Sequence, residues 1–168
     1  SSSSSLSFTT GIDSTFKIYR FRFINIHPSD NATRLKYNFS TDGGSNYNVA
    51  KTTISYQAYH QENDGNAGTN YETGTDLAQG TGSQFMGGDI LNENDGCMSG
   101  DMFLYNPGST TFQKHVVCEC CTLTNGNFST FHHTGTGYAN TTSAIDAVQF
   151  TMSTGTIDSG VIEMYGIN

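Results

Sequence analysis

The sequence predicts an all-β protein, an antiparallel β-sandwich that is jelly-roll-like. Three observations carry this prediction: apolar residues alternate with polar ones in short segments, Gly-rich turn signals separate the segments, and helical periodicity is almost absent. The chain of 168 residues has no internal repeats, which argues against a solenoid or a propeller. We expect a single domain over residues 1–168, with a Gly-, Asn- and Asp-rich loop excursion at about 61–101.

The first strand is predicted from a clean alternation near the N-terminus. Tyr19, Phe21 and Phe23 are separated by arginines, so they share one apolar face of a strand. Ile24 and Ile26 then fall on the opposite face, unless a β-bulge near Phe23–Ile24 restores the alternation. Without such a bulge, both faces of this strand would be partly covered, and the sequence leaves the two alternatives open.

The remaining strands follow from the same pattern. A second strand covers 35–39 and is followed by a strong turn signal, Asp42-Gly43-Gly44-Ser45. In a third strand, Ile54, Tyr56 and Ala58 form the apolar set. Further strands are predicted at 102–105, 112–122, 148–152 and 161–165.

Composition excludes several classes of function. Only 13% of the residues are charged and the net charge is −8, so the chain lacks the Lys and Arg that bind nucleic-acid phosphates. The same sign disfavours an anionic membrane surface, and no apolar run is long enough to span a bilayer. No motif indicates a cofactor. The chain begins with serine rather than methionine, so we expect its true start to be missing.

The four cysteines leave three alternatives. On a strand, Cys118 and Cys120 point to one face and Cys121 to the other, so this strand alone cannot form a four-ligand zinc site. Buried free thiols that pack as small apolar residues are the favoured interpretation. A disulfide between Cys97 and Cys118, Cys120 or Cys121 is the second alternative, and a metal site completed by Cys97 or His132 and His133 is the third.

Other candidate ligands are weaker. We interpret His132-His133 as part of a surface loop or strand edge; the alternative is a histidine ring that holds an ion on a threefold axis. Acidic residues gather at Glu62, Asp64, Asp89, Glu93, Asp95 and Asp101, and we take them as solvated turn residues because no calcium loop is complete.

Tyrosines in or near loops are weak candidates for ligand binding. Tyr47, Tyr59 and Tyr71 could stack on a sugar, although loop tyrosines more often line protein interfaces. No nucleophile elbow, assignable carboxylate pair or phosphate-binding loop is present. We therefore predict that the protein is not an enzyme and has no catalytic residues.

Four segments together resemble one family of proteins. They are FTTGIDST at 8–15, NPGSTT at 106–111, GYANTTSAID at 137–146 and QFTMSTGTID at 149–158. They resemble small virion structural proteins of tailed phages, mainly marine ones, and shorter pieces extend the resemblance over nearly the whole chain. The family usually lacks cysteines at 118–121, so the resemblance gives these residues no shared role. What is shared is turn and strand chemistry.

The resemblance implies a role in the virion. It implies first a capsid decoration or cement protein that acts through oligomeric protein contacts, and alternatively a tail or fibre protein that recognises a host surface glycan or protein. Its expected partners are the major capsid or tail proteins of the same virion and further copies of itself, with a trimer as the first expectation. Its expected location is the virion, after assembly in the host cytoplasm.

Overall fold

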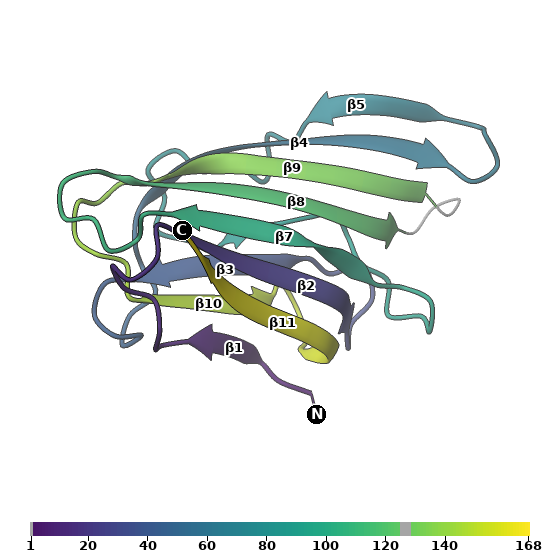
Figure 1. The fold of residues 1–168 in the computed structure, drawn as a ribbon. Helices are drawn as coiled ribbons and strands as arrows, with labels where there is room; N and C mark the ends of the chain where they lie inside the picture. Colours follow the sequence, from purple (N-terminus) through teal and green to yellow (C-terminus); the bar gives the residue numbers. More distant parts are fainter. Residues whose placement is uncertain (1, 125–128) are drawn as a thin grey trace.

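The computed structural model describes residues 2–124 and 129–168 and confirms the predicted all-β sandwich (Figure 1). No helix occurs within these residues. The strands are β1 (Ser5–Phe8), β2 (Ile18–Pro28), β3 (Leu35–Ser40), β4 (Lys51–Gln61), β5 (Ala67–Tyr71), β6 (Gln84–Phe85), β7 (Met98–Tyr105), β8 (Lys114–Thr124), β9 (Ser129–Ala139), β10 (Ala147–Met152) and β11 (Ile157–Ile167).

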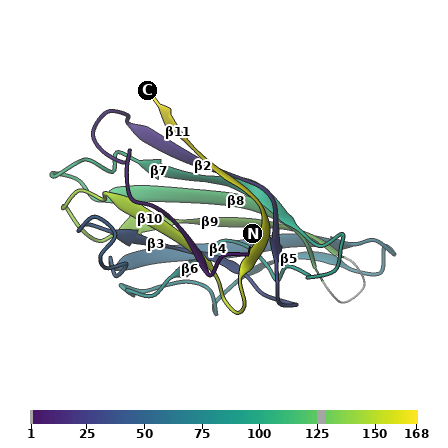
Figure 2. The ribbon, with the colours of Figure 1, turned by 90° about the horizontal axis from the view of Figure 1, so that it is seen from below.

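The strands form two antiparallel sheets of unequal size. The small sheet has the order β1-β10-β3-β6, and the large sheet has the order β11-β2-β7-β8-β9-β4-β5. The pairs β2–β11, β3–β10, β4–β9 and β7–β8 nest inside one another along the chain, which is a jelly-roll-like arrangement. Seen from below, the small sheet lies across part of the large one (Figure 2). The large sheet therefore extends past it, and β5 forms its outer edge (Figure 1).

The core between the sheets is aromatic. Tyr19, Phe21 and Phe23 of β2 are buried, as their alternation predicts. Phe150 of β10 packs edge to face against Phe21 and Phe23, with ring centroids 5.4 and 5.1 Å away. Phe8 of β1 meets Phe21 at 5.3 Å. These contacts join both sheets through large side chains, which provide most of the hydrophobic stabilisation per residue.

Of the two alternatives for β2, the structure has the bulge. The register with β7 shifts between Phe23 and Ile26, and Asn25 has a positive φ of 49°. Ile24 is 39% exposed, whereas Ile26 is fully buried. The extra residue therefore returns Ile26 to the core face of the strand.

The apolar face of β4 is a correction to the sequence analysis. Ile54 and Tyr56 point to solvent on the outer face of the large sheet, each 47% exposed, while Thr53 and Ser55 are buried. The inner face of β4 meets polar groups here rather than the aromatic core: Thr53 donates a hydrogen bond to Gln84 Oε1 (2.6 Å). Alternation located the strand correctly, but the polar residues line its inner face.

Two lysines are fully buried at one end of the large sheet. Lys51 and Lys114 both pair in register with Ala139. The Lys51 ammonium donates to Asn38 Oδ1 (2.6 Å) and the carbonyl of Val49 (2.8 Å), and its burial lowers its pKa to about 8. Lys114 donates to loop carbonyls, and its burial also lowers its pKa. Carbonyl and amide oxygens, rather than carboxylates, satisfy both ammonium groups.

The segment at 61–101 contains more strand than the sequence predicts. It includes β5 and β6, and β7 begins at Met98 rather than at Met102. β5 is an exposed edge strand of Ala, Gly, Thr, Asn and Tyr, so it carries no apolar alternation. A strand that covers no core leaves little pattern in the sequence.

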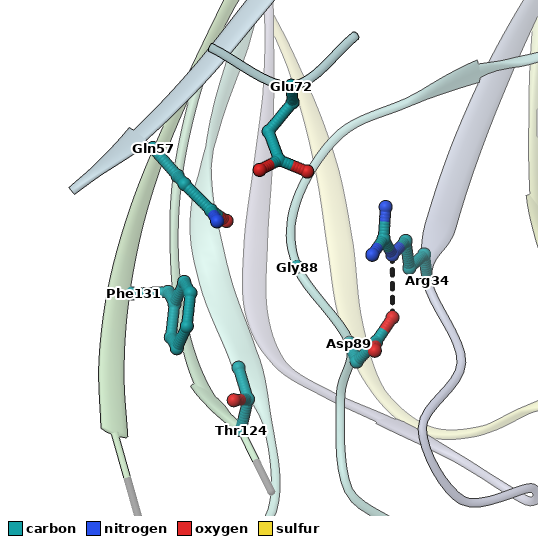
Figure 3. Close-up of a pocket in the computed structure, with 7 residues that line it drawn as sticks. All are labelled: Arg34, Gln57, Glu72, Gly88, Asp89, Thr124 and Phe131. Carbon is teal, nitrogen blue, oxygen red and sulfur yellow. Dashed lines mark hydrogen bonds and ion pairs between the residues drawn. The ribbon is translucent and has the colours of Figure 1, made fainter. Parts of the chain in front are cut away.

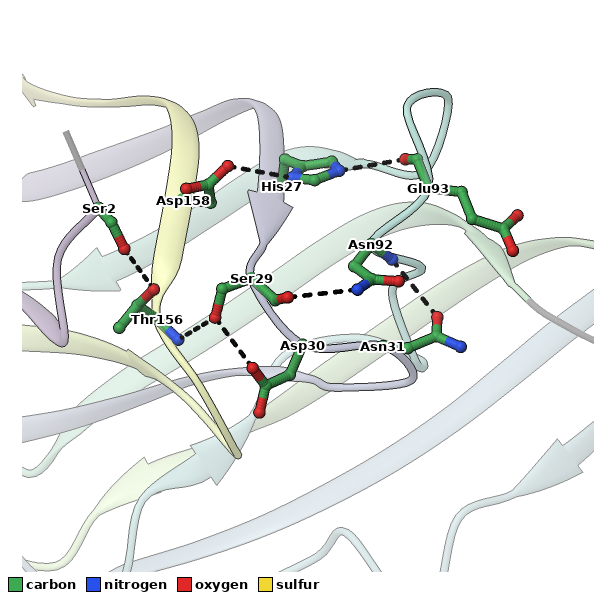
Figure 4. A network of polar contacts seen from close by, with 9 residues as sticks. All are labelled: Ser2, His27, Ser29, Asp30, Asn31, Asn92, Glu93, Thr156 and Asp158. Atoms are coloured by element: carbon green, nitrogen blue, oxygen red, sulfur yellow. Dashed lines mark hydrogen bonds and ion pairs between the residues drawn. The ribbon is translucent and has the colours of Figure 1, made fainter.

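Polar contacts tie the loops together at one end of the sandwich (Figure 4). Asn92 donates from Nδ2 to the carbonyl of Ser29 (3.2 Å), and Ser29 Oγ accepts from the backbone of Thr156 (2.9 Å). His27 Nε2 lies 3.1 Å from the carbonyl of Glu93. These contacts fix the segment after Ile90 against the loop that precedes β3.

Candidate functional site

A polar cleft opens on the inner face of the large sheet, where that sheet extends past the small one. Its volume is about 280 Å³. Strands β4, β8 and β9 and the residue after β5 form one wall, while the residue before β3 and the loop after β6 form the other (Figure 3). The lining residues are Arg34, Gln57, Glu72, Gly88, Asp89, Thr124 and Phe131.

Strand register and backbone pairing place these side chains. Gln57 of β4 lies directly opposite His133 of β9, whose side chain is on the inner face of the sheet. Residues opposite one another point to the same face, so the Gln57 side chain also points inward. The backbone of Glu72 donates to the carbonyl of Ser55 (2.9 Å) and extends the β4–β5 pairing by one step. On the other wall, Thr33 and Ile90 form an isolated antiparallel β-bridge. Arg34 follows Thr33 and Asp89 precedes Ile90, so the bridge brings these two residues together.

An ion pair organises the second wall of the cleft. Arg34 donates from Nε to Asp89 Oδ1 at 2.6 Å, and its guanidinium lies over the Phe85 ring, 5.6 Å from the centroid. The two terminal guanidinium nitrogens make no hydrogen bond to any residue in the described ranges. Because the ion pair is already formed, its side chains are preorganised for binding. Because the two side chains are about one-third exposed, a ligand can still reach them.

The first wall supplies amide and carboxylate groups. Gln57 donates from Nε2 to Asn70 Oδ1 (3.1 Å), and Asn70 in turn donates to the Glu72 carboxylate. These contacts use the amide nitrogen of Gln57 and one oxygen of Glu72. The Gln57 carbonyl oxygen and the second Glu72 oxygen are left to accept hydrogen bonds in the cleft. The two walls therefore offer donors and acceptors that face one another.

A stacked row of rings supports the floor. Tyr59 stacks on Phe131 at 5.3 Å between centroids and 19° between planes, and Phe131 stacks on His133 at 6.0 Å and 16°. A glycine packs against each end of this row of rings. A Cβ added to Gly68 would lie 3.1 Å from Tyr59 Oη, and a Cβ added to Gly88 would lie 2.7 Å from His133 Nε2. Phe131 therefore packs against two neighbouring rings while it also lines the cleft. Most of the other lining side chains are polar, so they supply the hydrogen bonds to a ligand.

Two buried polar atoms beneath the cleft have no hydrogen-bond partner among the described residues. His133 Nε2 and Thr122 Oγ1 are buried and make no hydrogen bond within the described residues. An unpaired buried polar group costs about 1–3 kcal/mol, so two neighbouring ones call for a reason. Burial, together with the charges of Arg34 and His132, lowers the pKa of His133 to about 4. The ring is therefore neutral at pH 7.

The three candidate tyrosines lie in different places. Tyr59 belongs to the ring row but does not line the cleft. Tyr71 ends β5 on the outer face, 48% exposed, and donates to Asp76 Oδ2 (2.6 Å). Tyr47 lies in the loop between β3 and β4, and its hydroxyl is buried without a partner among the described residues. The structure brings none of the three together.

The cysteines divide between the two faces of β8 as predicted. Cys118 and Cys120 are buried, and their burial raises the pKa of Cys118 well above its usual value and that of Cys120 to about 12. Cys121 is exposed and shares a shallow outer pocket with Cys97. All four are free thiols. No group of three or more Cys, His, Asp or Glu ligands is assembled by the described residues.

The histidine pair is a second correction. It lies on β9, an internal strand of the large sheet, and not on a loop or an edge. His132 is exposed on the outer face, whereas His133 is 3% exposed on the inner face. The polar residues around the pair suggested a surface segment, but the overhanging inner face of this sheet is itself polar.

No local sequence pattern marks Arg34, Gln57 and Glu72 as site residues. The sequence presents Asp89 only as one of several acidic turn residues, and the structure pairs it with Arg34. The one available signal is the polar set of β4, which contains Gln57.

No protein-family model and no curated protein sequence matches the chain. The described part of the chain holds no helix of the length and apolar character that a membrane span requires.

Proposed function

We propose that the chain is a virion structural protein of a tailed phage whose cleft binds a glycan on the host surface. The virion role rests on the resemblance of its turn and strand motifs to small phage virion proteins. The recognition role rests on one observation, the open polar cleft between the Arg34–Asp89 pair and the Gln57 and Glu72 side chains. This cleft favours a tail or fibre role over the decoration role, which the resemblance implies first.

The chemistry of the cleft suits a hydroxyl-rich ligand. Sugar hydroxyls donate and accept, and the cleft offers free guanidinium donors on one wall and amide and carboxylate acceptors on the other. Because the Arg34–Asp89 pair is already formed, these side chains lose little conformational entropy when a ligand binds. The protein binds the glycan without turnover in this proposal.

The test is binding of the labelled protein to an array of bacterial surface glycans. We expect retention on specific glycans and a loss of about tenfold or more in Arg34→Gln, since hydrogen bonds to charged groups contribute about 1.5–3 kcal/mol. Arg22→Gln is the matched control, because Arg22 lies on β2 with a 3.6 Å contact to Asp101. Absence of retention, or an equal loss in both variants, would contradict the proposal.

A second candidate, self-association as a decoration protein, is favoured by the outer face of the same strands. Ile54, Tyr56 and Tyr71 are each about half exposed, and Tyr56 pairs directly with Tyr71. Such a group of exposed apolar side chains is typical of protein contacts. We expect a concentration-dependent oligomer by sedimentation that Tyr56→Ser weakens and the exposed Phe112→Ser does not. A monomer at all concentrations would exclude this role.

A further inference from the structure

We propose that Gly88 covers an inner part of the cleft, where His133 Nε2 and Thr122 Oγ1 bind one hydroxyl of the ligand. This inference rests on the proposed glycan-binding function and deepens it. It assigns a second, buried contact to the same ligand, in addition to the open contacts at Arg34, Asp89 and Gln57.

The two atoms that lack a partner among the described residues lie close to a single glycine. An ideal Cβ on Gly88 would lie 2.7 Å from His133 Nε2 and 3.3 Å from Thr122 Oγ1. Gly88 also lines the cleft, beside Asp89. One residue without a side chain therefore separates two unsatisfied polar atoms from the space that a ligand enters. Any side chain at this position would press on the imidazole of His133, so glycine is the residue that fits here.

The segment that carries Gly88 is held at both ends and is short between them. Met86 donates from its backbone to the carbonyl of Leu35 (3.0 Å), and Ile90 is bridged to Thr33. Asn92 continues the attachment through Ser29 (Figure 4). Only 87–89 lie between these anchors, and two of the three are glycines, whose backbone moves with the least steric restriction.

The open and inner contacts are coupled through the backbone. Asp89 follows Gly88 directly and forms the ion pair with Arg34. A ligand that binds to this ion pair therefore also affects the Gly88–Asp89 peptide, which covers His133. A hydroxyl suits the inner position because it donates one hydrogen bond and accepts another. Thr122 Oγ1 can donate to the ligand oxygen, while the neutral imidazole nitrogen accepts from the ligand hydroxyl.

The test follows the side chains by NMR during titration of the isotope-labelled protein. The probes are methyl α-D-mannopyranoside, methyl β-D-galactopyranoside and methyl β-D-glucopyranoside, together with any glycan retained on the array. We expect each saccharide that shifts the Gln57 side-chain amide to shift His133 Nε2 and the Gly88 amide as well. A shift at Gln57 alone would overturn the inner contact and leave glycan binding intact. No shift at Gln57 with any of these probes would overturn both proposals.

Two variants make the assignment specific. Thr122→Val removes the hydroxyl at nearly constant shape, so we expect an unchanged fold and affinity lower by roughly threefold to tenfold, as for one neutral hydrogen bond. Gly88→Ala should weaken binding, whereas Gly82→Ala should not, because nothing lies within 4 Å of an added Cβ on Gly82. Unchanged affinity in Thr122→Val, or one fixed water bridging the two atoms with and without ligand, would overturn the inference.

Discussion

Replacing Gly137 with alanine is expected to destabilise the protein by at least about 3 kcal/mol, a large part of the stability of a domain. Gly137 lies on β9 between β8 and β4. A Cβ at this position would overlap the carbonyl oxygen of Thr52 and come within 2.8 Å of Thr53 Cα. Both obstacles are backbone, so the strands must separate for the side chain to fit.

The same strand provides a matched control for this change. Gly135 lies two residues away on the same face, but its added Cβ would meet only ordinary contacts, 3.8 Å from the carbonyl oxygen of Ile54. We expect Gly135→Ala to be neutral or slightly stabilising, because alanine restricts the unfolded chain. Urea unfolding of both variants measures the difference. Equal stability of the two would show that β4 and β9 are less tightly paired than described.

Acidification is expected to remove roughly 2–3 kcal/mol of stability through His133 alone. Its pKa is about 4 in the folded protein against an ordinary value of 6.5. Above pH 6.5 the ring is neutral in both states and the full stability is present. As the pH falls from 6.5 towards 4, the unfolded chain binds a proton that the folded protein does not, so stability decreases.

The measurement compares the free energy of unfolding at pH 7 and pH 4.5 for the wild type and two variants. His133→Gln has no titrating ring, so its difference between the two pH values should be smaller by that amount. His115→Gln serves as the control, because this ring is exposed on β8 and does not contribute to the pKa of His133. If His133→Gln retains the full pH dependence, the burial of the ring is not its cause.

Alternation predicted the fold well wherever a strand covers the aromatic core. The apolar face of β2 and the opposite directions of Cys120 and Cys121 both follow from a period of two, whereas the bulge before Ile26 was only one of two alternatives. These positions are determined locally, by which side of a strand faces the second sheet.

The site could not be predicted, because it depends on how far the two sheets overlap. Alternation in β4 shows that Ile54 and Gln57 lie on opposite faces, but not which face is covered. That is decided by the unequal strand numbers of the sheets. The cleft also joins residues from Arg34 to Phe131, and only the pairing of Thr33 with Ile90 brings Arg34 and Asp89 together. No local pattern encodes such a pairing.

The buried lysines restrict where the protein can be modified through its amines. The chain has four lysines, and burial of Lys51 and Lys114 leaves the side chains of Lys17 and Lys36 for acylating reagents and cross-linkers. Lys17 immediately precedes β2, and Lys36 lies on β3. Coupling through lysine side chains therefore attaches the folded protein to a bead or a dye at two defined positions, neither of which lines the cleft.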